Sequence, residues 1–468
     1  MNDFETFKSW IRDVEGRYGK QAFSSFNLKY LDGSSFDDYY STVFNGNDPV
    51  KMQRNRFRTP FQLERDRILY SSTFQRLADK TQLFTTEAIN LTENRLTHSL
   101  KVMQISRSIA RGLKLNEDLV ETIALGHDVG HPPFAHIGEE ALEEWATRKL
   151  GKKQLILGGK FPIVEDKTKK FFTIGNDPGE KYFLHGRQGF RILTLKRNSD
   201  YLRFSKPVMY GIWRHSVNNF EFDKDFKFNT KIEGKEISLS GSDDLTYEAQ
   251  IVRYADDIAW VVSDLEEAFN NDILNYKDIS PIIRNVKDRS ETFYLRLSNA
   301  LTDPINGSEL LTLFISDIIE NNLDKLENSN DKAPFEIKFS SDVENVFNCL
   351  KKYIKEKLHN KYFMARGSQM NKARVISLCD WYFEHPKEFL NDIKNKMNTP
   401  TFPIHLKINK ASSNPDDIIL NYSDNELYEY LISDVEKPIN RKYKISTIMD
   451  FVSVLTDHEI SKLSETMP

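Results

Sequence analysis

The stretch HDVGHPPFAHIGEE, residues 127–140, places three of the chain's ten histidines and three acids around two prolines. The residues before it, ETIAL, are apolar at helical spacing, and the two prolines cannot continue a helix. One helix is therefore expected to end near His127, and the next is expected to begin close to His136 and Glu139. The stretch predicts two helices joined by a short turn that is rich in ionisable side chains.

Outward from this stretch, apolar residues recur at helical spacing through most of the chain, which predicts an all-α fold. Four apolar residues of one such segment, 96–113, are expected on one side of its helix: Leu100, Met103, Ile109 and Leu113. Further helices are expected at 62–79, 117–126, 137–149, 187–196, 246–270, 308–327, 342–358, 369–382 and 445–464. The clearest strand signal is the alternation in 221–240 around Glu233-Gly234-Lys235, which predicts a small β-hairpin.

The composition is that of a globular protein, with 468 residues of which 39% are hydrophobic and 29% charged. Lysine and arginine number 65 against 69 aspartates and glutamates, so the net charge of −4 gives no reason to expect nucleic acid or an anionic membrane as a partner. Cys349 and Cys379 are too few for a disulfide framework and fit a reducing compartment. Neither a signal peptide nor a run of about 18 apolar residues is evident. We therefore expect a soluble, cytoplasmic protein with no membrane partner.

Histidines and acids elsewhere in the chain can complete a metal site with His127 and Asp128. This adjacent pair can turn towards one ion, although a helix-end histidine beside a capping aspartate has the same sequence. His98 lies 29 residues upstream of His127, and the acid-rich stretch YADDIAWVVSDLEE, 254–267, follows downstream. Histidine nitrogens and carboxylate oxygens without a thiolate suit a divalent transition metal, Mg²⁺ or Mn²⁺ rather than a structural zinc. The sequence thus predicts a mixed metal site with free positions for water or phosphate.

Two further sets of polar residues have helical spacing. Asp256, Trp260 and Asp264 are four residues apart, so a helix would point them into one cleft. From spacing alone, a solvated acidic edge with a buried tryptophan is an equal alternative. His136 and Glu139 are three residues apart, and a carboxylate that holds an imidazole is a common arrangement for proton transfer or for positioning a nucleophile.

Five blocks of sequence carry a family resemblance. They are RTPFQLERDRILYSSTFQRLADKTQLF (58–84), RLTHS (95–99), HDVGHPPFAHIGEEAL (127–142), HGRQGFRIL (185–193) and EAQIVRYADDIAW (248–260). In this order they resemble the deoxyguanosinetriphosphate triphosphohydrolase (dGTPase, dNTPase) family of HD-domain phosphohydrolases, whose metal signature is H…HD…D. A closing segment of that family is similar to IMDFVSVLTDHEI (448–460).

The resemblance implies the HD-domain helical fold, organised in three regions. These are an N-terminal helical or irregular extension (1–54), an HD catalytic core (55–270) with insertions at about 151–183 and 216–245, and a helical C-terminal lobe (271–468). The β-hairpin would belong to the second insertion.

The resemblance also implies a role for each matching residue. The metal ligands would be His98, His127, Asp128 and Asp256, where Asp256 is preferred to Asp257 because related sequences keep the first acid of this pair. The catalytic residues would be His136, supported by Glu139, and His131, which would line the phosphate site. The substrate-binding residues would be Gln82, Arg95, Trp260 and Asp264.

Among the substrate-binding residues, Gln82 and Asp264 match positions that sense the deoxyribose 3′-hydroxyl, and Arg95 would contact phosphate. Trp260 stands where the family usually has a tyrosine stacked under the sugar, so it keeps the aromatic face and loses the phenol. Arg214 and His215 are weaker candidates that a surface pair explains equally well. Gly186 departs from the asparagine that related chains usually carry.

The activity implied by the resemblance is metal-dependent hydrolysis of dNTPs, with dGTP favoured, to a deoxynucleoside and inorganic triphosphate by attack of water at the α-phosphorus. The metal would be Mn²⁺, Mg²⁺, Fe²⁺ or Co²⁺. His136 would act as base, acid or water-orienting group. A homo-oligomer, hexameric or otherwise trimer-based, and a nucleotide or single-stranded DNA effector are also implied. The alternatives are another HD phosphohydrolase, acting on a cyclic nucleotide or an alarmone, and a non-catalytic nucleotide or single-stranded DNA sensor.

Overall fold

The computed structural model describes residues 3–31, 34–45, 57–82, 93–150, 182–194, 204–215, 227–232, 235–240, 246–284, 291–302, 304–329, 335–359, 366–397 and 438–466. Nearly all regular structure in these ranges is helical, which confirms the predicted all-α fold. The helices up to the centre of the chain are α1 (Asp3–Glu15), α2 (Phe36–Asn45), α4 (Pro60–Leu69), α5 (Ser72–Gln75), α6 (Arg95–Gly112), α7 (Glu117–Gly126), α8 (Ala135–Leu150), α10 (His185–Thr194), α11 (Lys206–Arg214) and α13 (Tyr247–Asn270). The later helices are α14 (Tyr276–Arg284), α15 (Glu291–Ala300), α16 (Gly307–Asn328), α17 (Ser341–Ile354), α19 (Arg366–Glu384), α20 (Pro386–Met397), α22 (Pro438–Val454) and α23 (Asp457–Glu465). Short helical turns form η1 (Ser25–Asn27), η2 (Arg76–Asp79) and η4 (Lys355–His359).

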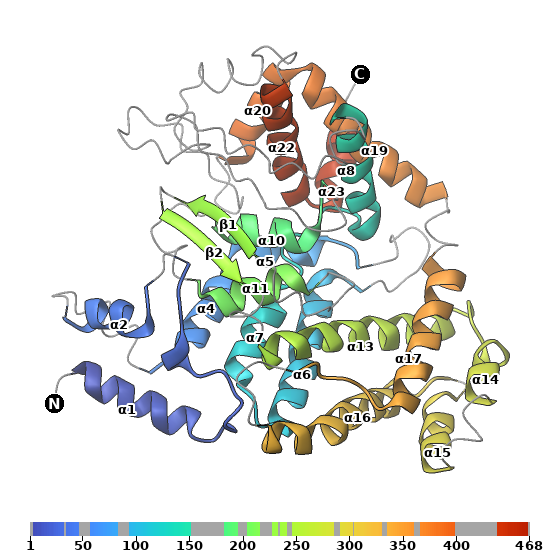
Figure 1. Cartoon of the computed structure of the whole chain (residues 1–468). Helices are drawn as coiled ribbons and strands as arrows, with labels where there is room; N and C mark the ends of the chain where they lie inside the picture. Colours follow the sequence, from blue (N-terminus) through green and yellow to red (C-terminus); the bar gives the residue numbers. More distant parts are fainter. Residues whose placement is uncertain are drawn as a thin grey trace.

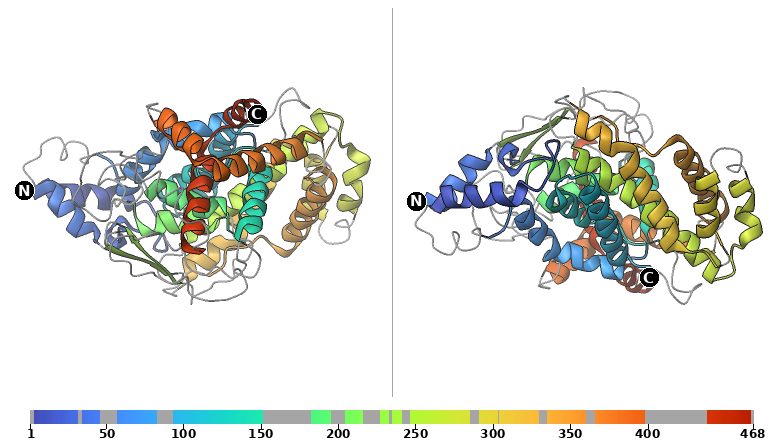
Figure 2. Two further views of the ribbon diagram at one scale, coloured as in Figure 1. Left: turned by 90° about the horizontal axis from the view of Figure 1, so that it is seen from above. Right: turned by 90° about the horizontal axis from the view of Figure 1, so that it is seen from below.

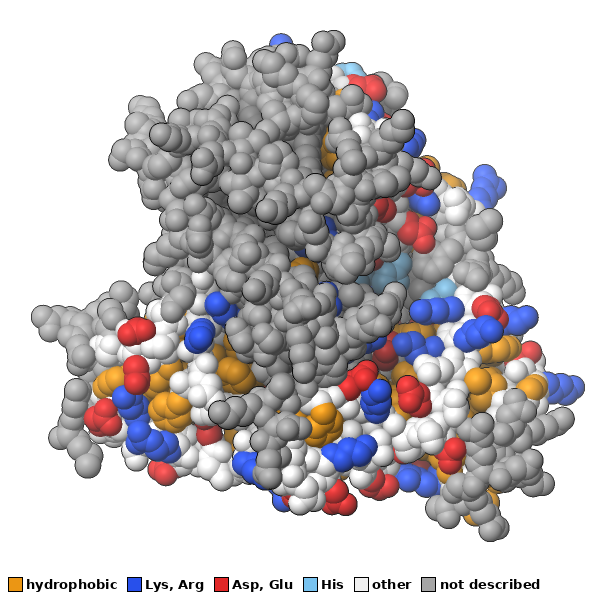
Figure 3. Space-filling model, viewed as in Figure 1, with side chains coloured by type: hydrophobic (Ala, Val, Ile, Leu, Met, Phe, Trp, Pro, Cys, Tyr) orange, Lys and Arg blue, Asp and Glu red, His pale blue; other side chains and the backbone are white. Residues whose placement is uncertain are grey.

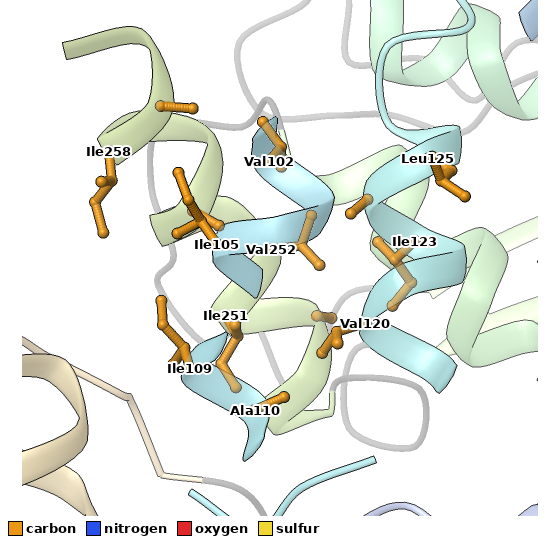
Figure 4. Close-up of a cluster of buried hydrophobic side chains, with 14 of the residues drawn as sticks. Val102, Ile105, Ile109, Ala110, Val120, Ile123, Leu125, Ile251, Val252 and Ile258 are labelled. Atoms are coloured by element: carbon orange, nitrogen blue, oxygen red, sulfur yellow. The ribbon is translucent and has the colours of Figure 1, made fainter. Parts of the chain in front are cut away.

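Helices α6, α7 and α13 form the centre of the fold, with α4 beside α7 and α16 beside α6. Each of the three begins at a residue whose side-chain oxygen accepts an N–H from the first turn: Asn94, Asn116 and Thr246. Their branched apolar side chains point towards one another, as Figure 4 shows for Val102, Ile109, Ile123 and Ile251. This rigid centre carries the ends of α6 and α7 on which the predicted metal ligands lie.

The predicted buried face of α6 was wrong in one respect. Leu100 is 42% exposed, whereas Ile109 is completely buried. Nine residues correspond to about two and a half helical turns, so these two side chains point in opposite directions. The face that α6 buries instead contains Val102 and Ile105 together with Ile109.

A second hydrophobic cluster joins α8 to helices near the C-terminus, which stand together at the top of Figure 1. Trp145 of α8 is completely buried there, and its Nε1–H donates to Asp380 of α19 over 2.9 Å. The helices after residue 271 consequently pack on two sides of the molecule. Helices α16 and α17 pack against α13, whereas α19 and α22 pack against α8 and α23 packs against α19.

The views from above and below in Figure 2 place α1 at one end of the molecule and α14 and α15 at the other. The central helices lie between these ends. The C-terminal residues of α23 are far from α1.

The predicted β-hairpin is present, and residues 221–226 of the predicted alternation lie outside the described residues. Strand β1 (Lys227–Ile232) pairs antiparallel with β2 (Lys235–Ser240), and the register runs from Lys227 opposite Ser240 to Ile232 opposite Lys235. Glu233 and Gly234, which were expected to form the turn, lie outside the described residues, as do 151–181 of the first predicted insertion.

Two segments predicted as single helices are broken at a local capping signal. The segment 62–79 divides where Ser71 caps α5, and 445–464 divides where Thr456 forms a capping box with Glu459 at the start of α23. The other predicted helices are confirmed within a few residues of their bounds. Among the described residues, six helices had no specific prediction: α1, α2, α11, α14, α15 and α20.

Within the described residues, no helix is long and apolar enough to cross a membrane. Cys349 is exposed and Cys379 is buried, and both are free thiols, as predicted.

Candidate active site

The turn between α7 and α8 brings the predicted histidines to the centre of the molecule. His127 follows directly on Gly126, the last residue of α7, and its Nδ1 lies 2.6 Å from the carbonyl oxygen of Ala124. A carbonyl can only accept, so Nδ1 carries a proton and Nε2 is the nitrogen that faces Asp128 and Asp256. Burial lowers the pKa of His127, but these two carboxylates outweigh it and raise the pKa to about 9, so a cation at Nε2 would replace a proton. Nε2 is buried and has no hydrogen-bond partner among the described residues. Such an oriented, unpartnered nitrogen is suited to a metal ion.

The four predicted metal ligands converge on this nitrogen. His127 Nε2 lies 3.4 Å from Asp128 Oδ1 and 3.7 Å from Asp256 Oδ1, and Asp256 Oδ1 lies 2.9 Å from His98 Nε2. His98, His127 and Asp128 are buried, and Asp256 is partly exposed. Ligand atoms held at about 2.1 Å from one ion are separated by about 3 to 4 Å. His98, His127 and Asp128 form one group of close donor atoms, and Asp256 adjoins this group through its contacts with His98 and His127.

Neighbouring side chains keep both aspartates ionised. Burial alone would raise the pKa of Asp128, but His127, Arg95 and His131 outweigh it, and this pKa lies well below its usual range. Burial also opposes ionisation of Asp256, but the neighbouring His127 and His98 side chains outweigh it and lower the pKa well below its usual value. The site therefore offers two carboxylates to a cation.

Arg95, which was predicted to contact phosphate, is buried in the protein. It is 1% exposed, and its guanidinium is 2.7 Å from Asp128 Oδ2. The same group reaches the carbonyl oxygen of Gln82 at 3.4 Å. The geometry thus joins Arg95 to the metal ligand Asp128 and to the segment that carries Gln82.

A second group of histidines surrounds Glu139 beside the metal ligands. Glu139 Oε2 lies 3.3 Å from His136 Nδ1 and 3.2 Å from His185 Nδ1, and the backbone N–H of His185 donates to Oε1. Burial would raise the pKa of Glu139, but His185 and His136 lower it well below its usual value. His136 is half-exposed, so an ionised carboxylate holds one nitrogen of an imidazole that is open to solvent.

His131 connects the two groups. Its Nε2 lies 3.3 Å from Asp128 Oδ1, and its ring stacks on the His185 ring at 3.7 Å. Burial, Arg95 and His185 together lower the pKa of His131 well below its usual range. His131 is therefore a neutral imidazole at physiological pH.

His185 and His215 were not among the predicted site residues, although His215 was a weaker candidate. Their Nε2 atoms are 3.1 Å apart, and the His215 ring lies 4.9 Å from the His127 ring. Burial, His127 and His185 lower the pKa of His215 to about 3. The neighbouring Arg214 places its guanidinium over the Trp213 ring instead. The block HGRQGFRIL was the only signal for His185, since it is far from the other histidines in sequence.

The backbone of α10 approaches the α7–α8 turn closely at Gly130, and this contact brings His185 to the other histidines. A Cβ atom on Gly130 would lie 2.1 Å from the backbone nitrogen of Gly189 and 2.1 Å from the carbonyl oxygen of His185. Only glycine fits between the α7–α8 turn and α10 at this distance. The glycine of HDVGH thus allows α10 to contribute to the site.

The predicted substrate-binding residues other than Arg95 lie on two segments near the predicted metal ligands, the bridge that carries Gln82 and helix α13. Gln82 belongs to a short antiparallel bridge in which its N–H donates to the carbonyl of Glu93 over 3.0 Å, and its buried Oε1 has no partner in the part of the chain that the structure describes. Trp260 lies on α13 one turn after Asp256, and its Nε1–H donates to Asp257. Asp264 is buried one turn further on and is engaged with His359 of η4 at 2.8 Å.

Asp256 and Asp257 are distinguished by their partners. Asp256 contacts His98 and His127, whereas Asp257 pairs with Lys351 of α17 at 2.7 Å and accepts from Trp260. The geometry therefore places the first of the two adjacent acids in the metal cluster.

Figure 3 shows histidine side chains in a hollow between the upper and lower parts of the molecule, with lysines and arginines along its lower edge. Helix α17 and η4 carry the lysines Lys351, Lys352, Lys355 and Lys357, of which Lys351 lies beside the predicted substrate-binding residues. The Lys351 ammonium group lies 5.7 Å from the Trp260 ring. A local cationic surface therefore exists despite the slightly acidic whole chain.

Comparison with known proteins finds one matching family model and several relatives that share the same name. Residues 95–173 match the model of the HD domain family. A deoxyguanosinetriphosphate triphosphohydrolase-like protein of Neorickettsia sennetsu is 30% identical over 383 residues, which cover 78% of this chain and 89% of the relative. Proteins of the same description are 28% identical in Leptospira interrogans (76% of this chain, 87% of the relative) and 30% identical in Caldanaerobacter subterraneus (71% and 76%).

Proposed function

The chain belongs to the deoxyguanosinetriphosphate triphosphohydrolase-like family of HD-domain phosphohydrolases, and from this membership and the site geometry we propose that it hydrolyses deoxynucleoside triphosphates to a deoxynucleoside and inorganic triphosphate. The observation that carries the proposal is the cluster of His98, His127 and Asp128, with Asp256 in contact with both histidines. His131 connects this cluster to the His136–Glu139 pair. A phosphohydrolase needs both a charge-neutralising centre and a group that handles the proton of the attacking water.

The donor set His98, His127, Asp128 and Asp256 would hold the divalent cation, with Mn²⁺ or Mg²⁺ the first candidates and Fe²⁺ or Co²⁺ also compatible with the ligands. The unpartnered Nε2 of His127 and two ionised carboxylates support this assignment. When bound, the cation supplies Lewis-acid stabilisation of charge on the α-phosphate oxygens.

The His136–Glu139 pair would handle the proton of the attacking water. Ionised Glu139 accepts the Nδ1–H of His136, which leaves the lone pair of Nε2 on the half-exposed side of the ring. This lone pair would accept a proton from water as it attacks the α-phosphorus in line with the departing 5′-oxygen. His131, neutral and buried between Asp128 and His185, would contact the phosphate without adding charge.

The substrate would lie across the hollow between the two groups of residues. Gln82 and Asp264 would contact the 3′-hydroxyl, and Trp260 would stack against the sugar. Arg95 would act on the phosphate side through Asp128, which it neutralises. The lysines of α17 and η4 would attract the polyphosphate, because several negative charges accompany any dNTP into the site.

Product analysis tests this proposal. The purified protein is incubated with Mn²⁺ or Mg²⁺ and each of dGTP, dATP, dCTP, dTTP and GTP, singly and as mixtures, and the products are separated by ion exchange. We expect a deoxynucleoside and intact triphosphate, with dGTP as the preferred substrate. His127→Ala should abolish turnover, whereas His458→Ala, which changes an exposed side chain on α23, should leave it unchanged.

Other products would redirect the assignment. Hydrolysis of a cyclic nucleotide or an alarmone, with no release of triphosphate, would indicate another HD phosphohydrolase. Binding of nucleotide or single-stranded DNA without turnover under any condition would indicate a sensor.

We also propose that the protein is a homo-oligomer, hexameric or otherwise trimer-based, with a nucleotide or single-stranded DNA as effector. Light scattering coupled to size exclusion measures the mass of the assembly, and turnover of one dNTP with and without a second nucleotide or an oligonucleotide tests the effector. A monomer with no response to either addition would contradict this proposal.

A further inference from the structure

The junction between α22 and α23 lies against two segments that carry site residues. Asp457, the first residue of α23, is 323 positions from Phe134, yet its Oδ1 accepts the backbone N–H of Phe134 over 2.8 Å. Its Oδ2 accepts the backbone N–H of Thr81 over 3.0 Å and the hydroxyl of Thr81 over 2.5 Å. One carboxylate thus receives three donors from two segments.

The first of these segments is the turn that ends at His136. Phe134 and Ala135 have φ values of 59° and 57°, a backbone region that residues with a side chain rarely adopt. Consecutive residues in this conformation persist only where the surroundings hold them. Asp457 supplies such a restraint at Phe134, immediately before the imidazole that Glu139 orients.

Lys80 fixes the other end of the same turn. Its buried ammonium group donates to the carbonyl oxygen of His131 over 2.6 Å and to that of Ser453 in α22 over 2.8 Å. Both ends of the turn are therefore joined to the α22–α23 region, one through Lys80 and one through Asp457 directly.

The second segment is the bridge that carries Gln82 and Arg95. Thr81 pairs with Asn94, the N–H of Arg95 donates to the carbonyl of Lys80, and the N–H of Gln82 donates to the carbonyl of Glu93. Because Asp457 binds Thr81 in the middle of this bridge, its position sets the distance between the bridge and the turn.

We propose that Asp457 is a positioning residue that holds the His131–His136 turn and the Gln82 bridge in register with each other. The inference rests on the proposed function, in which these two segments act on the phosphate side and on the sugar side of one substrate. Asparagine cannot replace Asp457, because it has only one side-chain oxygen. Its amide NH₂ would face either the N–H of Phe134 or the N–H of Thr81, each of which now donates to a carboxylate oxygen.

Steady-state kinetics on three variants with the preferred dNTP test this role. For Asp457→Asn we expect kcat to fall about tenfold or more and KM to rise, because a small displacement of a reacting group has a large effect on rate. Thr81→Val removes the hydroxyl contact alone, so KM should rise while kcat stays within about twofold. His458→Ala, one residue along the same helix and exposed, should match the wild type.

Two further measurements separate positioning from a loss of structure. Bound metal of Asp457→Asn should stay close to that of the wild type, and the melting temperature should fall only modestly, so that the variant is fully folded at the assay temperature. Hydrogen exchange should become faster in peptides containing the Thr81 and Phe134 amides, with no change in His458→Ala. Kinetic constants of Asp457→Asn within about twofold of the wild type, or losses of kcat that parallel losses of metal or folded protein, would overturn the inference.

The exchange measurement also distinguishes the two proposals from each other. If the wild type releases no triphosphate from any dNTP, the proposed function fails, and the exchange rates alone decide whether Asp457 holds the two segments. Unchanged exchange at both amides would overturn the inference independently of any activity.

Discussion

Arg95 and Asp128 form an ion pair of 2.7 Å in which neither side chain is more than 4% exposed. Removal of one partner from a buried pair leaves an unpaired charge and costs about 3–5 kcal/mol. Asp128 is also a predicted metal ligand, so a bound cation can neutralise its negative charge in place of Arg95. The stability effect of losing Arg95 should therefore depend on metal.

We expect Arg95→Met to lower the melting temperature strongly in EDTA and much less in saturating Mn²⁺. Differential scanning fluorimetry under both conditions measures this difference. Arg111→Met serves as the control, because Arg111 pairs with Glu117 at the surface and its loss should be small and independent of metal. Equal destabilisation of Arg95→Met with and without Mn²⁺ would show that no cation compensates Asp128.

Gly130→Ala should destabilise the protein and displace His131. The added Cβ would lie 2.1 Å from two backbone atoms of α10, which cannot rotate away, so we expect a loss of about 1–3 kcal/mol in the free energy of unfolding. Gly189→Ala is the matched control from the other side of the same approach, since its Cβ would be 3.4 Å from Gly130 N. Denaturant unfolding compares the two, and equal stability would contradict the close packing described for Gly130.

The local part of the site was predictable from sequence, and the remote part was not. His127, Asp128, His136 and Glu139 follow helix-end signals within a single stretch, so their neighbourhood is fixed by the turn itself. Asp256 required the H…HD…D pattern of a known family, because spacing on α13 alone fits an exposed acidic edge equally well.

The contributions of His185, Lys80 and Asp457 depend on packing between distant segments. No periodicity in the sequence indicates that α10 approaches Gly130, or that the start of α23 meets Thr81. The error at Leu100 has a different cause, because Leu100 was placed on one side of its helix with Ile109 although nine residues of helical phase separate the two. Side-chain type predicted which groups were available, and tertiary contacts decided which of them meet.

Trp260 should contribute to substrate binding through its aromatic face rather than through its indole nitrogen. The Nε1–H is engaged with Asp257, which in turn pairs with Lys351, so the ring plane is fixed beside the hollow. We expect Trp260→Ala to raise KM for a dNTP about tenfold with a smaller change in kcat. Trp260→Phe retains an aromatic face and should recover most of the affinity. A Phe variant as impaired as the Ala variant would assign the binding contribution to the indole nitrogen and its partners.

Glu64 of α4 should make stability fall as the pH rises from about 5 to about 8. Its side chain is completely buried, Oε2 accepts the N–H and hydroxyl of Ser205, and Oε1 has no partner among the residues described. Burial raises the pKa of Glu64 from 4.5 to about 8. The folded state therefore binds this proton more tightly than the unfolded state does, and the contribution to stability is complete below 4.5 and is lost progressively up to the folded pKa.

Glu64→Gln removes the titration while keeping the size of the side chain. The free energy of unfolding of the variant minus that of the wild type should therefore increase by at least about 1 kcal/mol as the pH rises from about 5 to about 8. Urea unfolding at several pH values measures the difference. Glu309→Gln, at an exposed position on α16, corrects for general effects of charge. If the difference in unfolding free energy between Glu64→Gln and the wild type does not change with pH, Glu64 is ionised in the folded protein. A cation or water near Oε1 would then stabilise its charge.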